Sequence, residues 1–329
     1  MEFQDFSVKG MKISRIGLGT WAIGGWLWGG TDEKEAINTI QSAVDMGINL
    51  IDTAPVYGFG HSEEVVGKAL KERGLRDKAV IATKCGLNWD KDENVFRDCT
   101  EERLRQELED SLRRLQTDHI DIYQIHWPDI KEPFANTAKL LASFVLEGKI
   151  RAIGVSNFSV EQMEEWRKYA PIHSIQPSYN IFESDMSRDI IPYALKNGIS
   201  ILGYSSLCRG LLSGKYTLDT KFNKGDMRDQ DDPKFHGENF KKHLEAVEEL
   251  KEIAAGLGKT VAQLAVRWVL DKGVTCALWG ARNVKQLEAM PGAMDWKLTD
   301  EQMKKMESIV NKHVPVQVDK EFLTPPCRD

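Results

Sequence analysis

Short apolar runs alternate with amphipathic segments along almost the entire chain. The apolar runs predict strands and read SRIGLGT, INLIDTA, AVIATKC, HIDIYQIHW, IRAIGVSN, HSIQPSYN, ISILGYSS and VTCALWG. After each run the apolar positions follow helical spacing, which predicts helices over about 33 to 46, 62 to 73, 100 to 115, 133 to 147, 159 to 168, 186 to 197, 240 to 256 and 283 to 290. Eight strand–helix units in one series predict a parallel (β/α)₈ TIM barrel, because a doubly wound sheet rarely needs so many.

Two segments stand outside this series. The N-terminal stretch FSVKGMKISRI contains a turn at Lys9–Gly10 and predicts a β-hairpin that closes the bottom of the barrel. The segment 216 to 237 follows the seventh strand, is rich in Asp, Lys and Gly, and is too long for an ordinary connection, so we interpret it as a functional loop. The length allows one or two domains, and the unbroken series favours a single barrel domain over 1–329.

Polar side chains with useful chemistry stand at the ends of three successive predicted strands. Asp52 ends the second strand and Tyr57 lies in the turn that follows, while Lys84 ends the third strand and His126 the fourth. In a parallel barrel these strand ends surround one mouth, which is the face where such barrels place their active sites. The sequence therefore predicts that the four side chains converge.

These four residue types fit one reaction. A tyrosine has a pKa of about 10, and we expect the ammonium of Lys84 to lower that pKa by stabilising the phenolate. Asp52 would keep Lys84 charged, and His126 would hydrogen-bond and orient a substrate oxygen. The set suits donation of a proton to a carbonyl oxygen that is becoming an alkoxide.

Two later segments are suited to a dinucleotide phosphate. YSSLCRGLLSGK, at 204 to 215, has small residues that let backbone amides approach an anion, and Arg209 and Lys215 add positive charge. WGARN, at 279 to 283, follows the eighth strand and leads into a helix, where barrels often bind phosphate. Arg282 is a natural partner for a 2′-phosphate, which favours NADPH over NADH.

Composition and charge narrow the possible partners. The net charge of -6 and the pI near 5.8 argue against nucleic acid and anionic membranes and favour a small molecule. We find no signal peptide and no apolar stretch long enough to span a membrane. His119 and His126 fall on opposite faces of one strand, and we expect no metal site. The absence of CxxC spacing argues against zinc or a disulfide framework and favours the cytoplasm; the cysteines are Cys85, Cys99, Cys208, Cys276 and Cys327.

The residues resemble the aldo-keto reductase family from end to end. The family's Asp, Tyr, Lys and His tetrad falls on Asp52, Tyr57, Lys84 and His126. The similarity is greatest to the bacterial general stress protein branch, which associates the chain with stress response. It runs through GLGTWAIGGWLWGG, IDTAPVYGFGHSEE, YQIHWPD, IRAIGVSNFS, IQPSYN, YSSLCRGLLSGKY, DPKF and ALWGARN. The resemblance implies a TIM barrel, extended NADPH and reversible, metal-free hydride transfer to an aldehyde or ketone, with Tyr57 as the proton donor.

The same resemblance implies cofactor contacts. Tyr204 would stack on the nicotinamide, with Ser156, Asn157 and Gln176 near its carboxamide. The remaining contacts would come from Thr20, Trp21, Asp52, Ser205, Ser206, Leu207, Cys208, Arg209, Lys215, Arg228, Gly280, Ala281, Arg282 and Gln286. Arg228, in the long loop, would clamp the cofactor.

The chain departs from the family pattern at two of these places. Many members have Asn where this chain has Met290, and Gly where it has Cys208. The first change removes an adenine contact. The second places a thiol near the pyrophosphate, which is either inert packing or an oxidisable group that blocks cofactor entry.

Tryptophans gather in the segments around the predicted mouth. Trp21, Trp89 and Trp127 predict an apolar, permissive substrate pocket for aromatic or medium-chain aldehydes. The C-terminal tail EFLTPPCRD either covers this mouth or lies elsewhere.

Three other functions are alternatives to carbonyl reduction. GLGTWA fits the dinucleotide fingerprint G-x-G-x-x-G/A, but a Trp/Gly loop follows it instead of a helix, which argues against a Rossmann dehydrogenase. Lys84 could form a Schiff base in a lyase. The chain could also be a nucleotide-binding accessory subunit with little turnover, and its oligomeric state is open, with a monomer favoured.

Overall fold

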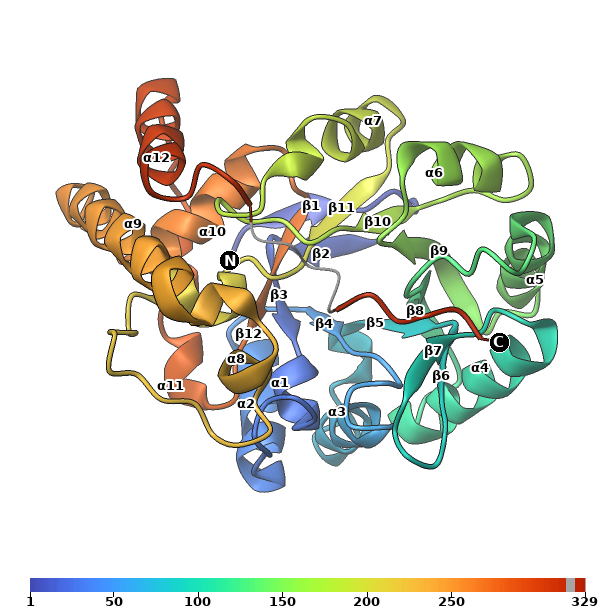
Figure 1. The fold of residues 1–329 in the computed structure, drawn as a ribbon. Coiled ribbons are helices and arrows are strands. Elements are labelled where there is room, and N and C mark those ends of the chain that lie inside the picture. The colour runs from blue at the N-terminus through green and yellow to red at the C-terminus, as the bar shows by residue number, and fades with distance from the viewer. Residues whose placement is uncertain (318–322, 329) are drawn as a thin grey trace.

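The computed structural model describes residues 1–317 and 323–328 and has a closed barrel at its centre (Figure 1). Eight parallel strands form the barrel, in the spatial order β10-β11-β12-β3-β4-β5-β8-β9. Each of them lies within one of the eight apolar runs, so the predicted TIM barrel is confirmed. The strands are β3 (Ile16–Gly19), β4 (Leu50–Asp52), β5 (Val80–Cys85), β8 (Ile120–Ile125), β9 (Ile150–Ser156), β10 (Ser174–Gln176), β11 (Ser200–Gly203) and β12 (Cys276–Gly280).

Helices surround the barrel, as Figure 1 shows. The two predictions over 186 to 197 and 283 to 290 were too long, because a 3₁₀ turn precedes the first of these helices and another follows the second. The helix at the C-terminal end, with a capping box from Thr299 to Gln302, was not predicted. The main helices are α2 (Glu33–Asp45), α3 (His61–Glu72), α4 (Glu101–Leu115), α5 (Phe134–Leu146), α6 (Val160–Arg167), α7 (Ile190–Lys196), α9 (Gly237–Gly256), α10 (Val261–Asp271), α11 (Val284–Leu287) and α12 (Asp300–His313).

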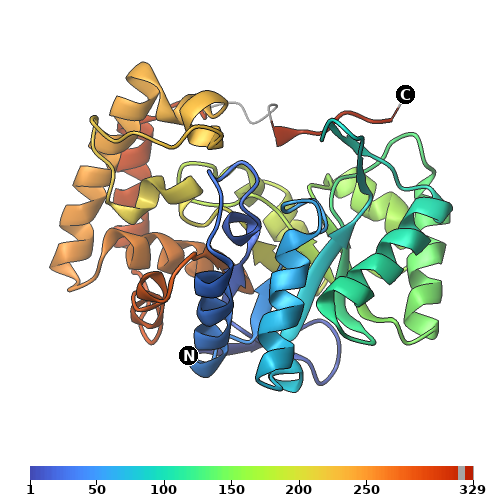
Figure 2. The same cartoon turned by 90° about the horizontal axis from the view of Figure 1, so that it is seen from below.

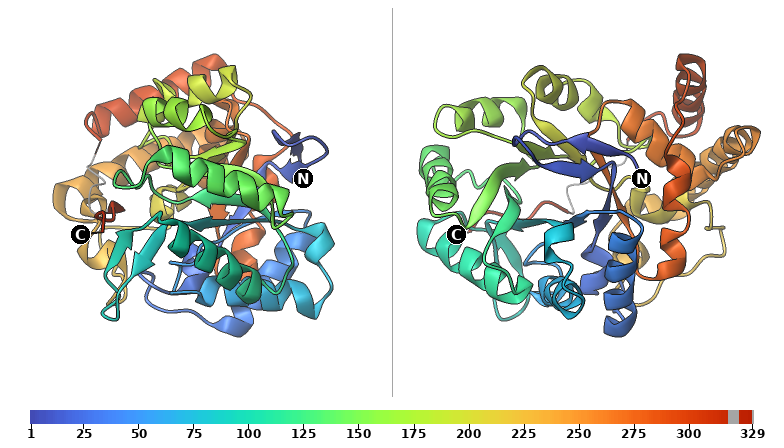
Figure 3. Two further views of the ribbon diagram at one scale, coloured as in Figure 1. Left: turned by 90° about the vertical axis from the view of Figure 1, so that its right-hand side faces the viewer. Right: turned by 180° about the vertical axis from the view of Figure 1, so that it is seen from behind.

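Two antiparallel hairpins lie at opposite ends of the barrel (Figure 2). The predicted one, β1 (Phe3–Asp5) and β2 (Lys12–Ser14), crosses the bottom, where Figure 3 shows it from behind. The second, β6 (Leu87–Trp89) and β7 (Val95–Arg97), follows β5 and was not predicted. The long loop over 216 to 237 contains two short pieces, α8 (Met227–Gln230) and a 3₁₀ turn (Pro233–Phe235). Another short helix, α1 (Trp21–Gly24), follows β3.

The strands have apolar side chains on both faces at the bottom of the barrel and polar ones inside at the top. Leu50, Ala82 and Ile122 share an apolar cluster with residues of the bottom hairpin, whereas their chain neighbours pack beneath the outer helices. Side chains two positions apart point the same way in a strand, so the positions after these three face the interior as well. Those positions are Asp52, Lys84 and Gln124, and the fold therefore sets buried polar groups on top of an apolar floor.

Among the residues described, no helix combines the length and the apolar character that a membrane span requires.

The contact between α3 and α4 depends on a glycine. A Cβ at Gly67 would lie 2.4 Å from the carbonyl oxygen of Arg114 and 2.8 Å from the Cα of Leu115. We expect Gly67→Ala to lower the free energy of unfolding by about 1–3 kcal/mol, because the two helices must separate. Urea denaturation followed by circular dichroism measures the change.

Gly256, at the end of α9, is the matched control. A Cβ there meets nothing within 4 Å, so Gly256→Ala should leave the free energy of unfolding unchanged or raise it by up to about 1 kcal/mol. Equal effects of the two substitutions would contradict the packing argument.

Candidate active site

A buried ion pair lies at the top of the barrel interior. The Nζ of Lys84 is 2.7 Å from Oδ1 of Asp52 and donates a second hydrogen bond, of 2.9 Å, to the carbonyl oxygen of Thr53. Lys84 is fully buried and Asp52 nearly so. Removing two charges from water is costly, and short, well-directed hydrogen bonds offset that cost. The pair therefore fixes both side chains in place.

Gln176 holds the other side of Asp52. Its Nε2 donates to Oδ2 of Asp52 over 2.7 Å, so both carboxylate oxygens accept a hydrogen bond. Thr20, expected near the cofactor, hydrogen-bonds the backbone carbonyl of Asp52 through Oγ1, over 2.9 Å. The carboxylate is thus held by Lys84 of the neighbouring strand β5 and by Gln176 of β10, across the barrel, while Thr20 holds the backbone of Asp52.

Tyr57 lies above this ion pair. Its ring stacks on Trp21 with centroids 5.7 Å apart and meets His126 edge-on at 5.9 Å. The Nζ of Lys84 is 5.0 Å from the centre of the Tyr57 ring. The structure therefore brings together all four side chains that the strand ends predicted.

The pKa values of these groups follow from burial. Burial, and then the charge of Asp52, raises the pKa of Tyr57 well above its usual value, so the expected net lowering of that pKa was wrong: burial disfavours the phenolate and outweighs its stabilisation by the ammonium of Lys84. Burial also lowers the pKa of Lys84, which Asp52 opposes. Burial and the charge of Lys84 lower the pKa of His126 well below its usual value. At neutral pH the site therefore presents a neutral phenol and a neutral imidazole.

A cavity of about 270 Å³ opens above these groups. Tyr57, His126, Trp21 and Trp127 line it, together with apolar side chains from both sides of the mouth. The prediction for Trp89 needs correction: it is not among the lining residues, because its ring packs against Phe59 at 5.4 Å and beneath the guanidinium of Arg103 at 5.2 Å.

The C-terminal tail supplies one wall of the cavity. Its residues 321, 322 and 329 lie outside the described residues, whereas 323–326 line the cavity. The tail runs beside the β6–β7 hairpin over the mouth (Figure 2), where the backbone N–H of Arg97 donates to the carbonyl of Pro326 over 2.8 Å. The side chain of Arg328 pairs with Asp129, which is buried. The tail thus covers the mouth, the first of the two predicted alternatives.

Several of the expected nicotinamide contacts border the same cavity. Ser156, Asn157, Gln176 and Tyr204 all line it. The hydroxyl of Tyr204 donates to Oδ1 of Asn157 over 3.0 Å, and Nδ2 of Asn157 donates to the backbone carbonyl of His126 over 2.9 Å. This network orients the Tyr204 ring at the cavity wall, so a planar ring could stack there.

The loop 205–210 turns sharply. Ser205, Cys208, Arg209 and Gly210 have left-handed φ values of 60°, 47°, 51° and 96°, and turns of this kind can present backbone N–H groups to an anion. The N–H groups of Cys208 and Gly210 are used within the loop, on the carbonyls of Ser205 and Leu207. The hydroxyl oxygen of Ser205 is buried without a hydrogen-bond partner among the described residues. These features fit the phosphates of a dinucleotide, which would supply the missing partner.

The three other predicted cofactor-binding cations lie in different surroundings. Arg209 is buried and ion-paired with Glu183 and Asp232, so its charge does not face the loop surface. Arg228 is ion-paired with Asp226 and lies over the rings of Trp28 and Phe222, as a long-loop arginine that already has partners. Lys215 is exposed.

The segment after β12 carries the other predicted contacts. Arg282 is half-buried and donates from Nη1 to the carbonyl of Trp28 over 3.1 Å, while its backbone N–H donates to the side chain of Gln286. Gly280 is exposed, and Ala281 and Met290 are buried. Two further predicted residues belong to the loop 205–210. The hydroxyl of the buried Ser206 donates to the carbonyl of Gly203, and Leu207 is half-buried against the core.

Cys208 is fully buried, and burial raises the pKa of its thiol to about 12. A protonated, buried thiol reacts slowly with oxidants, which favours the inert-packing alternative.

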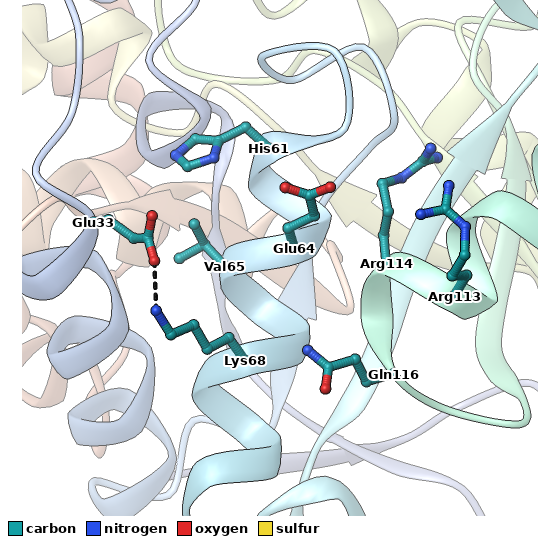
Figure 4. Close-up of a pocket in the computed structure, with 8 residues that line it drawn as sticks. All are labelled: Glu33, His61, Glu64, Val65, Lys68, Arg113, Arg114 and Gln116. Atoms are coloured by element: carbon teal, nitrogen blue, oxygen red, sulfur yellow. Dashed lines mark hydrogen bonds and ion pairs between the residues drawn. The ribbon is translucent and has the colours of Figure 1, made fainter.

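A second hollow of about 360 Å³ lies on the outer surface between α2, α3 and the end of α4 (Figure 4). Most of its charged residues already have partners: Lys68 pairs with Glu33 at 2.7 Å, Arg114 with Glu63 at 2.7 Å and Arg113 with Asp110 at 3.0 Å. Nothing in it points to a ligand, so the cavity at the barrel mouth is the candidate active site.

Comparisons with known proteins point to one family. The model of the Aldo/keto reductase family matches residues 15–311. The chain is 51% identical to the Aldo-keto reductase YhdN of Bacillus subtilis (strain 168), over 100% of this chain and 99% of that protein. It is 37% identical to the NADH-specific methylglyoxal reductase of Escherichia coli (strain K12), over 88% and 92% of the two chains.

A solved structure is equally similar. The glycerol dehydrogenase AKR11B4 from Gluconobacter oxydans superimposes with a TM-score of 0.89 at 50% identity, covering 96% of this chain and 97% of that one. The protein is therefore an oxidoreductase that uses a nicotinamide cofactor and acts on small carbonyl compounds. It belongs to the aldo-keto reductase family.

The tail's position predicts a role in substrate selection. A chain ending at residue 322 loses one wall of the cavity, so we expect kcat/KM for bulky aromatic aldehydes to rise about tenfold relative to that for small aldehydes. Steady-state kinetics with a size-graded aldehyde series measures the ratio.

Arg328→Gln is the milder companion, because it removes the ion pairs of this side chain with Asp98, Asp129 and Glu132 and leaves the tail in place, so it should change the ratio in the same direction by less. An unchanged ratio in both variants would show that the tail does not limit substrate size.

Proposed function

We propose that this protein reduces aldehydes and ketones to alcohols with NADPH, and that Tyr57 provides the proton. The proposal rests above all on the neutral phenol of Tyr57, which lines the cavity directly over the Lys84–Asp52 ion pair. Bound nicotinamide supplies the hydride that adds to the carbonyl carbon. The reverse reaction, alcohol oxidation, uses the same groups.

Proton delivery follows from the state of each group. As the C=O π electrons move to oxygen, that oxygen takes the phenolic proton of Tyr57, and the O–H bond of Tyr57 breaks. The phenolate left behind is stabilised by the nearby ammonium of Lys84, whose Nζ is 5.0 Å from the ring. His126, held neutral by burial, can donate a hydrogen bond to the same oxygen and orient it. Tyr57 regains its proton from solvent.

The alternative reactions receive less support. Lys84 is fully buried and is not among the cavity-lining residues, so its amine does not meet a carbonyl substrate as a Schiff-base lyase requires. The accessory-subunit alternative differs from reduction only in turnover, and the assembled tetrad favours turnover. Location in the cytoplasm, a single domain and a monomer stay predictions from the sequence.

The cofactor preference is proposed from Arg282. A guanidinium has five N–H donors, and one of them is used on Trp28, which fixes the side chain beside the strand end. The E. coli relative is named NADH-specific, so family membership alone does not decide between the two cofactors. Arg282 is suited to a 2′-phosphate, which NADPH has and NADH lacks.

The cavity favours a compact substrate. Its volume of about 270 Å³ lies at the lower end for small-molecule sites, and aromatic rings and the tail form its walls. Two of the three relatives named above are a methylglyoxal reductase and a glycerol dehydrogenase, and both compounds are small. We propose small and medium-sized aldehydes or ketones.

Tyr57→Phe tests the proton donor. The substitution keeps the stacking on Trp21 and removes only the hydroxyl, so we expect kcat to fall by about 100-fold or more while NADPH still binds. NADPH oxidation at 340 nm gives kcat, and fluorescence titration gives the dissociation constant. Normal turnover would remove Tyr57 from this role.

Arg282→Ala tests the cofactor preference. Loss of a charge-assisted contact should raise KM for NADPH about 10- to 100-fold and change KM for NADH by less than about threefold. Lys168→Ala, an exposed cation on α6, is the control and should change neither. Equal increases for both cofactors would argue against contact with the 2′-phosphate.

A further inference from the structure

Four charged side chains form a buried cluster next to the loop 205–210. We call Glu183, Arg209, Asp232 and Lys234 the buried ion cluster; none is more than 6% exposed. Arg209 pairs with Asp232 and, at 3.2 Å, with Glu183. Lys234 pairs with Glu183 at 3.0 Å and with Asp232 at 3.2 Å. Two cations thus face two anions, and the cluster has no net charge.

The cluster joins two connections between elements of the barrel. Glu183 follows β10, whereas Arg209 and, in the long loop, Asp232 and Lys234 belong to the connection between β11 and α9. Hydrogen bonds extend the cluster: Nδ2 of Asn180 donates to Glu183 over 2.8 Å and to the backbone carbonyl of Ser205 over 3.1 Å. The loop 205–210 is therefore held by the segment after β10 and by the long loop.

This loop needs external support. Ser205, Cys208 and Arg209 have side chains and yet adopt left-handed φ values, which cost about 1–2 kcal/mol per residue. Such conformations persist only where the surrounding structure fixes them, and they concentrate at ligand sites. Arg209 has one of these left-handed φ values, and its side chain is held by ion pairs with Glu183 and Asp232.

Stability alone does not explain the cluster. Replacing a buried ion pair by well-packed apolar groups often leaves stability equal or higher, because desolvation offsets the attraction. Four buried charges are therefore a weak source of net stability. They do, however, impose a single geometry, since each ion must face its partners.

We propose that the buried ion cluster positions the loop 205–210 so that the backbone N–H groups of its first residues, 205–207, meet the cofactor pyrophosphate; those of Cys208 and Gly210 donate to carbonyls within the loop. Glu183, Asp232 and Lys234 act as positioning residues that work through Arg209 and Asn180 and do not touch the cofactor. The proposal rests on the proposed cofactor site and adds what holds that site in shape.

Substitutions of opposite charge separate positioning from electrostatics. Asp232→Asn gives the cluster a net positive charge and Lys234→Met a net negative one. If the cluster acts by position, both variants should raise the dissociation constant of NADPH about tenfold or more. If only its charge matters, Asp232→Asn should tighten binding and Lys234→Met should weaken it, and that opposite response would overturn the proposal.

Two readouts complete the binding titration. Hydrogen exchange of the apo protein should show faster exchange in 204–212 for both variants, an effect that needs no cofactor. In steady-state kinetics KM for NADPH should rise by a larger factor than kcat falls, because the tetrad is unaltered. Unchanged exchange together with an unchanged dissociation constant would overturn the proposal.

Asp271→Asn is the matched control. It removes a 2.7 Å ion pair with the buried Arg267 in α10, a helix outside the proposed cofactor loop. It should lower stability like the cluster variants but leave NADPH affinity and exchange in 204–212 unchanged. A similar loss of affinity in this control would reduce the cluster's effect to general destabilisation.

Lys234→Arg keeps all four charges and serves if the other variants do not fold. The planar guanidinium keeps the positive charge and alters only the geometry of the cluster. If the cluster acts by position, this variant should bind NADPH more weakly, by a smaller factor than the other variants. An unchanged affinity would contradict the proposal. The two proposals fail differently. If the unsubstituted protein does not bind NADPH, the proposed function is overturned. If the unsubstituted protein and the cluster variants bind NADPH equally well, only this inference is overturned.

Discussion

The ion pair between Lys84 and Asp52 is the constraint on which the active site depends. Both charges are buried in the barrel, so each must be matched by short contacts, and Thr53 and Gln176 provide them. The same burial keeps Tyr57 protonated and His126 neutral. An isolated lysine at this place would tend to lose its proton, and a phenolate formed above it would then have no counter-charge. The carboxylate thus helps to keep the lysine charged.

The alternation of side chains along the strands explains why this pair lies where it does. The inward positions of β4 and β5 change from apolar to charged between Leu50 and Asp52 and between Ala82 and Lys84. Below that level residues of the bottom hairpin and the strands form one apolar cluster, so the charges lie on its upper side. A one-residue shift in either strand would send its charge toward the outer helices, and for this reason the register is part of the chemistry.

These local relations were visible in the sequence, whereas contacts between distant loops were not. The strand runs and their polar ends predicted the barrel and the convergence of Asp52 and Lys84, because strand order and direction alone bring them together. No local pattern indicated that Arg209 would turn inward to Glu183 and Asp232, since a cation in a Ser/Gly loop resembles a phosphate ligand until its buried partners are known. The tail and Trp89 are of the same kind: their neighbours lie far away in the chain.

Different parts of the fold hold the proposed catalytic ion pair and shape the substrate cavity. The ion pair beside the proposed proton donor is fixed by barrel strands, while one wall of the cavity is made by chain-end residues anchored on Arg97 and Asp129. The described tail anchors reach the β6–β7 hairpin and the segment after β8 and do not include Lys84 or Asp52. A change in the tail can therefore reshape the substrate wall without disturbing the ion pair. By the same reasoning, a change in the buried ion cluster acts on the cofactor loop and leaves the proton donor in place.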